Sequence, residues 1–214
     1  MTRIEKLLSI SSEAIVSTLP DNTAIIEDFP LGAGLHSILK QKNGFYAFES
    51  ALHVFPLTDE PVNGANLAEW NSPSLWRDDY GVLTQRLLFF AEDVFQDQFC
   101  LSSNGVLRFK AETGGTTPVA DSLEGWADHV IRNYDQVTGW TFAKKWQAEN
   151  GPLPPGKRLM PKIPFFLGGP YAMDNLWAGD AVEGMRFKAD IAMQTRNMAD
   201  GTTVRMVFRK KPAN

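Results

Sequence analysis

The sequence is poor in the residues that most often carry catalytic or metal chemistry. It has one cysteine, Cys100, and three histidines among 214 residues. A single cysteine cannot form a disulfide within the chain, and Cys100 lies in a strand pattern, so we expect a packed, unreactive thiol. His36, His53 and His129 stand 17 and 76 residues apart, whereas metal ligands on one element usually stand about three to five apart. We therefore expect no metal site and no cofactor.

Long apolar runs and strong charge of one sign are also missing. No stretch reaches the roughly 18 apolar residues that a membrane-spanning helix needs, and Glu5 and Glu13 interrupt any signal-like region at the N-terminus. The net charge of −4 does not favour a general nucleic-acid binder. With 43% hydrophobic residues, the chain is too apolar for a disordered protein. We expect a folded, cytoplasmic protein that does not bind membranes.

The small net charge conceals two regions of opposite sign. Residues 1–149 contain 11 Lys and Arg against 20 Asp and Glu, whereas residues 150–214 contain 10 against 5. The sign changes at Gly151–Gly156, a segment rich in proline and glycine that is typical of a linker. We predict a domain over residues 1–150 and an extension over residues 151–214 that packs on it. Whether the basic extension faces the acidic region or a partner stays open at this point.

Local signals place helices and strands along most of the chain. A helix is expected after Asp28 and Pro30 and ends at Asn43-Gly44, where a left-handed residue costs little. The middle of the chain predicts strands and turns at Leu87–Ala91, Phe95–Leu101, Asn104-Gly105 and Glu112–Gly115. Later elements are a helix capped by Asp121 and Glu124, a buried run at Ile163–Leu167, a helix at Ala181–Met198 and a strand at Thr203–Phe208.

Acidic residues are concentrated between positions 59 and 97, which hold eight Asp and Glu and two Lys and Arg. The adjacent pairs Asp78-Asp79 and Glu92-Asp93 cannot act as catalytic pairs on an extended strand, because neighbouring side chains point to opposite faces. Such a cluster on a surface would instead attract a basic partner.

Tryptophan is enriched at binding hot spots, and the sequence has six. Three lie on apolar helical stripes, which favours packing in the core: Trp126, Trp140 and Trp146. The other three stand in polar, loop-like contexts and are the candidates for an interface: Trp70, Trp76 and Trp177.

The order of these features resembles the SUKH superfamily, the cell-wall-regulator-like family of bacterial immunity proteins. The resemblance rests on an early helix with an Asn-Gly end, a central strand followed by acids, a second strand with its hairpin, and a closing helix that contains Trp126: Leu31–Gly44, Leu87–Asp93, Phe95–Gly105 and Ser122–Tyr134. Together these segments cover about residues 28–135. The sequence departs from the family pattern at Gln96, where members usually have a glycine.

The resemblance implies an α+β fold, with helices packed on one face of a mainly antiparallel sheet and a C-terminal α/β extension. It also implies binding, because many members neutralise a toxin, often a nuclease or a deaminase, encoded beside them. The family pattern supplies no catalytic residue. We therefore expect a non-catalytic immunity protein that caps the basic surface of a toxin domain without binding nucleic acid directly. The residues expected to contact this partner are Trp76, Asp78, Asp79, Glu92, Asp93 and Asp97.

Two other functions stay open at the level of the sequence. One is a regulatory scaffold without a toxin partner, and a toxin gene immediately upstream would argue against it. The other is a hydrolase, which would need converging carboxylates and a perturbed histidine around one pocket.

Overall fold

The computed structural model of the protein describes residues 1–199 and 201–203. The strands are β1 (Phe45–Ala47), β2 (Leu52–Val54), β3 (Leu88–Asp93), β4 (Gln98–Ser102), β5 (Gly105–Lys110), β6 (Gly115–Ala120), β7 (Lys157–Pro161) and β8 (Leu176–Asp180). The α-helices are α1 (Arg3–Ser9), α2 (Ala24–Glu27), α3 (Gly32–Gln41), α4 (Leu67–Trp70), α5 (Asp78–Tyr80), α6 (Leu123–Arg132), α7 (Tyr134–Thr138), α8 (Trp140–Asn150) and α9 (Ala181–Thr195). Shorter turns are the π-helix η1 (Pro73–Arg77) and the 3-10 helices η2 (Gly81–Thr84), η3 (Phe165–Leu167) and η4 (Met173–Asn175). None of the helices in the described ranges combines the length and hydrophobicity that crossing a bilayer requires.

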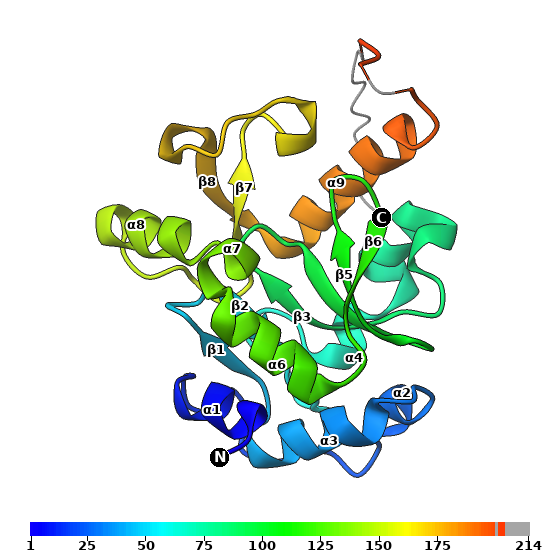
Figure 1. Ribbon diagram of the computed structural model, residues 1–214, viewed down its shortest axis with the longest axis vertical. Coiled ribbons are helices and arrows are strands. Elements are labelled where there is room, and N and C mark those ends of the chain that lie inside the picture. Colours follow the sequence, from blue (N-terminus) through cyan, green and yellow to red (C-terminus); the bar gives the residue numbers. More distant parts are fainter. Residues whose placement is uncertain (200, 204–214) are drawn as a thin grey trace.

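Strands β1–β6 form one antiparallel sheet in which each strand pairs with its neighbour in the sequence (Figure 1). The predicted α+β fold is therefore confirmed. The two turns predicted around β5 are present, and each contains a glycine at positive φ, 119° at Gly105 and 68° at Gly114. These local signals set the register of the strands that follow them.

Aromatic side chains pack on both faces of the sheet, because adjacent residues of a strand point to opposite sides. Phe89 of β3 contacts Trp76 of η1, and Phe90 contacts Trp126 of α6, each with ring centroids 5.0 Å apart. Every residue of β3 and β4 is buried. Helical elements thus cover both faces of the central strands, rather than the single face that the family resemblance implies.

Helix α6 has Ser122 as its N-cap, and the Ser122 hydroxyl accepts a hydrogen bond from the amide three residues later at 3.2 Å. The prediction that Asp121 caps this helix and pairs with Glu124 is therefore wrong, because the N-cap is the next residue along the chain. Glu124 instead accepts a hydrogen bond from the backbone amide of Arg3 at 2.8 Å. This contact fixes the start of α1 against α6.

The chain beyond Gly151–Gly156 packs against the acidic region. Strands β7 and β8 form a separate antiparallel pair, and the Leu159 amide donates to the Val94 carbonyl at 2.9 Å. The side-chain amide of Gln96 donates to the Ala181 carbonyl at the start of α9, at 2.6 Å. The extension therefore contacts the large sheet at the turn between β3 and β4.

The C-terminal predictions have three different outcomes. The helix predicted over Ala181–Met198 is present as α9, which ends three residues earlier. The run Ile163–Leu167, expected to be buried, is a wrong prediction, because it forms the turn η3 and the Ile163 and Phe166 side chains are largely exposed. Most of the strand predicted over Thr203–Phe208 lies outside the residues that the structure describes.

Candidate functional site

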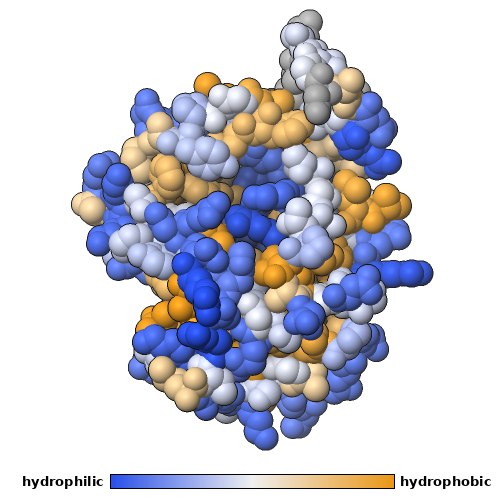
Figure 2. Space-filling model, viewed as in Figure 1, coloured by the Kyte–Doolittle hydropathy of each residue, from blue (hydrophilic) through white to orange (hydrophobic). Residues whose placement is uncertain are grey.

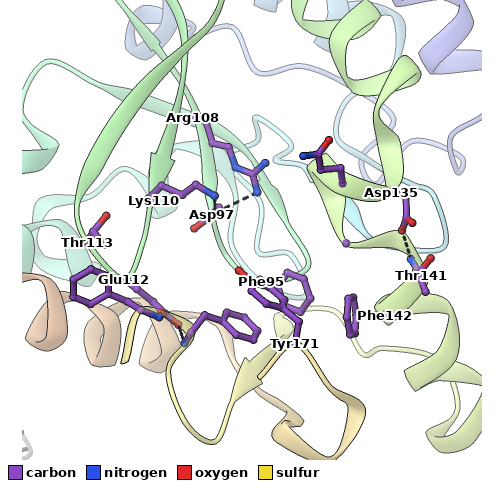
Figure 3. A pocket seen from close by; sticks show the side chains of 14 residues that line it. Phe95, Asp97, Arg108, Lys110, Glu112, Thr113, Asp135, Thr141, Phe142 and Tyr171 are labelled. Atoms are coloured by element: carbon purple, nitrogen blue, oxygen red, sulfur yellow. Dashed lines mark hydrogen bonds and ion pairs between the residues drawn. The ribbon is translucent and has the colours of Figure 1, made fainter. Parts of the chain in front are cut away.

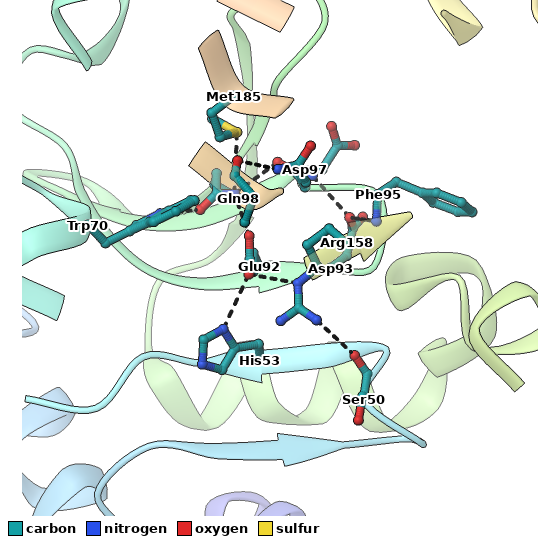
Figure 4. Close-up of polar contacts among 12 residues, drawn as sticks. Ser50, His53, Trp70, Glu92, Asp93, Phe95, Asp97, Gln98, Arg158 and Met185 are labelled. Atoms are coloured by element: carbon teal, nitrogen blue, oxygen red, sulfur yellow. Dashed lines mark hydrogen bonds and ion pairs between the residues drawn. The ribbon is translucent and has the colours of Figure 1, made fainter. Parts of the chain in front are cut away.

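A buried network of charged side chains connects the β7–β8 pair to the large sheet (Figure 4). Glu92 of β3 accepts a hydrogen bond from Arg158 Nε of β7 at 2.7 Å and lies 3.2 Å from His53 Nδ1 of β2. Gln98 donates to the second Glu92 oxygen at 3.3 Å. All four side chains are buried. At this point the basic extension faces the acidic region. Of the two orientations that the sequence left open, Arg158 therefore takes the one towards the acidic region.

The protonation states in this network follow from its burial and its partners. Burial raises the pKa of a carboxyl group, but at Glu92 the Arg158 and His53 side chains outweigh burial and hold the pKa at about 2. Burial lowers the pKa of His53 to about 4, so the ring is neutral at pH 7 and donates its Nδ1 proton to Glu92. One negative charge is therefore matched by one positive charge inside the protein.

A second set of charges surrounds the turn between β3 and β4. Asp93 accepts hydrogen bonds from the amides of Phe95 and Asp97, at 2.8 and 3.0 Å, and pairs with Arg108 at 2.5 Å. Burial raises the pKa of Asp93 to about 7 against the opposing charge of Arg108. Asp97 pairs with Arg108 at 3.2 Å and with Lys110 at 2.7 Å. These acids hold the turn in shape.

Gln96 occupies the same turn with a φ of 70°, a conformation that glycine adopts more easily than other residues. This is the position at which the family pattern has a glycine. The buried Gln96 side chain uses its amide nitrogen to bind the Ala181 carbonyl, and its oxygen accepts a hydrogen bond from Lys188 Nζ at 3.1 Å. A glycine could make neither contact, so the glutamine ties the turn to α9.

Beside this turn, a cleft of about 820 Å³ lies between the β5–β6 hairpin, the α7–α8 segment and the β7–β8 connection (Figure 3). One group of lining residues is aromatic: Phe95, Phe142, Phe165, Phe166 and Tyr171. The other main group is charged: Asp97, Arg108, Lys110, Glu112 and Asp135. A concave surface that combines aromatic rings with a few charges is the usual form of a binding site.

The aromatic side chains of the cleft pack on one another. Phe165 and Tyr171 stack with ring centroids 3.8 Å apart and planes 5° apart. Phe95 packs edge-on against Phe142 and Phe165, at 5.5 and 5.3 Å. The Glu112 carboxylate accepts hydrogen bonds from both backbone amides at the start of η3, at 3.2 and 2.6 Å. The wall is therefore held in place from both sides.

The β7–β8 connection exposes large hydrophobic side chains beside the cleft. The exposed fractions are 54% for Ile163, 51% for Phe166 and 63% for Tyr171, and we refer to these three residues as the β7–β8 rim. Figure 2 shows hydrophobic residues gathered over this end of the molecule and hydrophilic residues around the hollow beneath it. Exposed apolar groups that cluster in this way often mark an interaction site.

Three of the six residues predicted to contact a partner are buried: Trp76, Glu92 and Asp93. The prediction that they form a surface is therefore wrong. Trp76 is enclosed by aromatic rings, with Trp70 and Phe89 at centroid distances of 5.5 and 5.0 Å. The two acids are enclosed by their own cationic partners. The two carboxylates are paired inside the fold, whereas the buried Trp76 indole nitrogen has no hydrogen-bond partner.

The other three predicted residues do not form one site. Asp78 is exposed and Asp79 is half-buried, and both lie on α5, which packs against α9. The Asp79 carboxylate is 4.0 Å from Arg186 of α9. Asp97 is the one residue of the six that lines the cleft. The acidic cluster of the sequence is thus divided among three places in the fold.

Sequence reasoning missed most of the cleft, because its walls come from segments far apart in the chain. One signal for it is present in the sequence: the turn Gly168-Gly169-Pro170 carries aromatic residues on both sides, at Phe165, Phe166 and Tyr171. Among the tryptophans proposed for an interface, Trp177 is 47% exposed, whereas Trp70 and Trp76 are buried.

The reactive groups considered from the sequence lie away from the cleft. Cys100 is buried on β4 and burial raises its pKa to about 12, as expected for a packed thiol. No histidine lines the cleft, and His53 lies in the buried network. Within residues 1–199 and 201–203, no group of three or more His, Cys, Asp and Glu side chains is placed to hold a metal ion.

The burial of His53 predicts a loss of stability on acidification. The neutral ring is favoured in the folded state, so its contribution is complete above pH 6.5, the ordinary pKa, and is lost as the pH falls towards 4. A difference of about 2.5 pH units corresponds to about 3 kcal/mol. Between pH 7 and 4, the free energy of unfolding of the unaltered protein should fall by this amount more than that of His53→Gln. The glutamine keeps a donor for Glu92 but does not titrate. Urea unfolding of both proteins between pH 7 and 4 measures the difference, and parallel pH profiles would contradict it.

Comparisons with known proteins identify the fold but no family. No family model matches the chain, and no curated protein matches it in sequence. Among solved structures, the crystal structure of Atu4351 from Agrobacterium tumefaciens is similar, with a TM-score of 0.57 at 12% sequence identity. The similarity covers 86% of this chain and 87% of that one. At this identity, the likeness concerns the fold alone.

Proposed function

We propose that the protein is a non-catalytic immunity protein that binds a cognate bacterial toxin and neutralises it by covering its basic surface. The observation that carries the proposal is the exposed β7–β8 rim beside a cleft that contains more carboxylates than cations. Aromatic and large aliphatic side chains, once buried against a partner, supply much of the energy of protein interfaces. The resemblance of the sequence to immunity proteins supports a toxin as the partner.

The charge distribution supports a basic partner. Glu92 and Asp93 are neutralised inside the fold, but exposed acids remain elsewhere in the acidic region of residues 1–149: Asp59, Glu60, Glu69, Asp78 and Asp135. A toxin that cleaves or modifies nucleic acid needs Lys and Arg to contact phosphates. An acidic protein can occupy such a groove, and complementary charge speeds its capture. We place this capture in the cytoplasm, where such a toxin would meet its substrate.

The test uses the protein encoded immediately upstream of the gene for this chain, as the candidate toxin. We expect tight binding by isothermal titration calorimetry, and protection of cells in which the two proteins are co-expressed. The double variant Ile163→Ser/Phe166→Ser should weaken binding about tenfold or more. The matched control is Ile10→Ser, because Ile10 is 40% exposed and follows α1 at the opposite end of the molecule (Figure 1).

Each outcome of this test bears on the proposal. An upstream protein that is harmless, or that does not bind, overturns the immunity function. Binding to a harmless upstream protein would favour the regulatory scaffold. Equal effects of the rim variant and the Ile10 variant would remove the β7–β8 rim from the interface.

A further inference from the structure

We infer that the cleft receives an arginine side chain of the partner, with the guanidinium stacked on Tyr171 and hydrogen-bonded to Asp135. This inference deepens the proposed function and rests on it for the source of the arginine, because a basic toxin surface supplies such side chains. The chemistry of the cleft itself depends only on this chain and can be tested without the toxin.

The aromatic wall offers a ring to a flat cation. Tyr171 is stacked on Phe165, yet it remains 63% exposed. Phe142 stands beside it, with ring centroids 6.2 Å apart and planes tilted by 53°. Figure 3 shows Tyr171 and Phe142 turned towards the cleft, with Asp135 on the side of α7. A cation over such rings is attracted by their electron-rich faces.

The charges of the cleft favour a cation over an anion. Three carboxylates line it, from Asp97, Glu112 and Asp135, against the two cations Arg108 and Lys110. Both cations are already in ion pairs with Asp97. After burial itself, the carboxylates of Asp97 and Glu112 raise the pKa of the Tyr171 phenol, the direction expected where negative potential prevails.

An anionic ligand would find no unpaired cation among the residues that line the cleft. The Arg108 Nε atom lacks a hydrogen-bond partner, but it is buried and a ligand cannot reach it. Lys110 is accessible, but its ammonium group lies 2.7 Å from Asp97. An anion would therefore have to displace a carboxylate that the fold already provides.

Asp135 is the carboxylate available to a ligand. One of its oxygens accepts the Thr141 amide at 2.7 Å, and the side chain is exposed at the cleft. Asp97 and Glu112, in contrast, are engaged by Lys110 and by the amides of η3. A guanidinium is planar and carries several donors, so it can stack on a ring and bind a carboxylate at the same time. An ammonium group is a point charge without a planar face to stack on a ring, which is why the inference names arginine.

The cleft can be tested with small probes on the full chain. The probes are Nα-acetyl-arginine methylamide and its citrulline counterpart, which has nearly the same shape without the charge. Amide resonances of Thr141, Phe166 and Tyr171 report binding by NMR. We expect the arginine probe to bind about fivefold or more tightly than the citrulline probe, and added salt should reduce this preference.

Four variants locate the contacts. Asp135→Asn keeps the oxygen that accepts the Thr141 amide, and it should reduce arginine binding to the citrulline level. Tyr171→Ala should do the same, whereas Tyr171→Phe should bind as the unaltered chain does. Asp174→Asn is the matched control, because Asp174 is also exposed but does not line the cleft.

Equal binding of the arginine and citrulline probes would overturn the inference, as would an unchanged affinity in Asp135→Asn or Tyr171→Ala. A lysine probe that binds as well as arginine would overturn the assignment of a guanidinium. If the arginine probe binds but the upstream toxic domain does not, the cleft assignment stands and the proposed function fails. If the toxic domain binds but the arginine and citrulline probes bind equally, the proposed function stands and the cleft assignment fails.

Discussion

Replacement of Arg158 by methionine is expected to lower the free energy of unfolding by about 3–5 kcal/mol. The reason lies in the partner that is left behind. Glu92 is buried beside Arg158, and its pKa of about 2 depends on the arginine, with His53 as a second contributor. Without the guanidinium, either a charged carboxylate stays in the interior or Glu92 takes up a proton, and each alternative costs stability.

Two variants make this expectation specific to the buried pair. Lys157→Met removes a neighbouring ion pair with Asp180 that is partly exposed, and it should cost less than about 1 kcal/mol. The double variant Glu92→Gln/Arg158→Met should recover part of the loss, because the uncompensated charge is gone. Chemical denaturation measures all three proteins. If Arg158→Met is no more costly than Lys157→Met, the network is not a major source of stability.

Replacement of Trp76 by alanine should cost about 3–5 kcal/mol, the usual range for deleting a large buried aromatic side chain. Trp76 is 1% exposed and contacts Trp70, Tyr80 and Phe89 with ring centroids between 5.0 and 5.6 Å away. Its indole nitrogen is buried without a hydrogen-bond partner. Trp76→Phe keeps most of the packing and removes this unpaired donor, so it should be far less costly than alanine.

This pair of variants separates a core residue from a contact residue. Thermal unfolding should show a large drop for Trp76→Ala and a small one for Trp76→Phe. If Trp76→Ala unfolds at the same temperature as the unaltered chain and loses only toxin binding, the tryptophan belongs to the interface after all.

The parts of the fold that the sequence predicted correctly depend on local chemistry. Asn104-Gly105 predicts a tight hairpin because its glycine accepts a positive φ, and the register of β4 and β5 follows from it. The helix predicted after Pro30 is present as α3, but it ends at Gln41, two residues before Asn43, and its C-cap Lys42 is extended rather than left-handed. In each case, the residues that decide the structure are a few positions apart.

The candidate site could not be predicted in the same way, because its residues are placed by contacts between distant segments. A count of acids cannot show that Glu92 meets Arg158, which is 66 residues away in the chain. A polar context around Trp76 does not reveal that the neighbouring aromatic residues fold over it. The aromatic wall of the cleft likewise joins Phe95 to Phe142 and Tyr171. Charge and aromatic content indicated binding, but tertiary structure decides which residues are accessible.

The long-range partners of the β3–β4 region also affect the order in which the protein is completed on the ribosome. Glu92 and Gln96 are synthesised well before Arg158 and Lys188, which lie 66 and 92 residues further along the chain. Until those residues emerge from the ribosome, the Glu92 carboxylate lacks its ion-pair partner and the Gln96 side chain lacks its lysine donor. A chain that stalls early should therefore remain open to proteases.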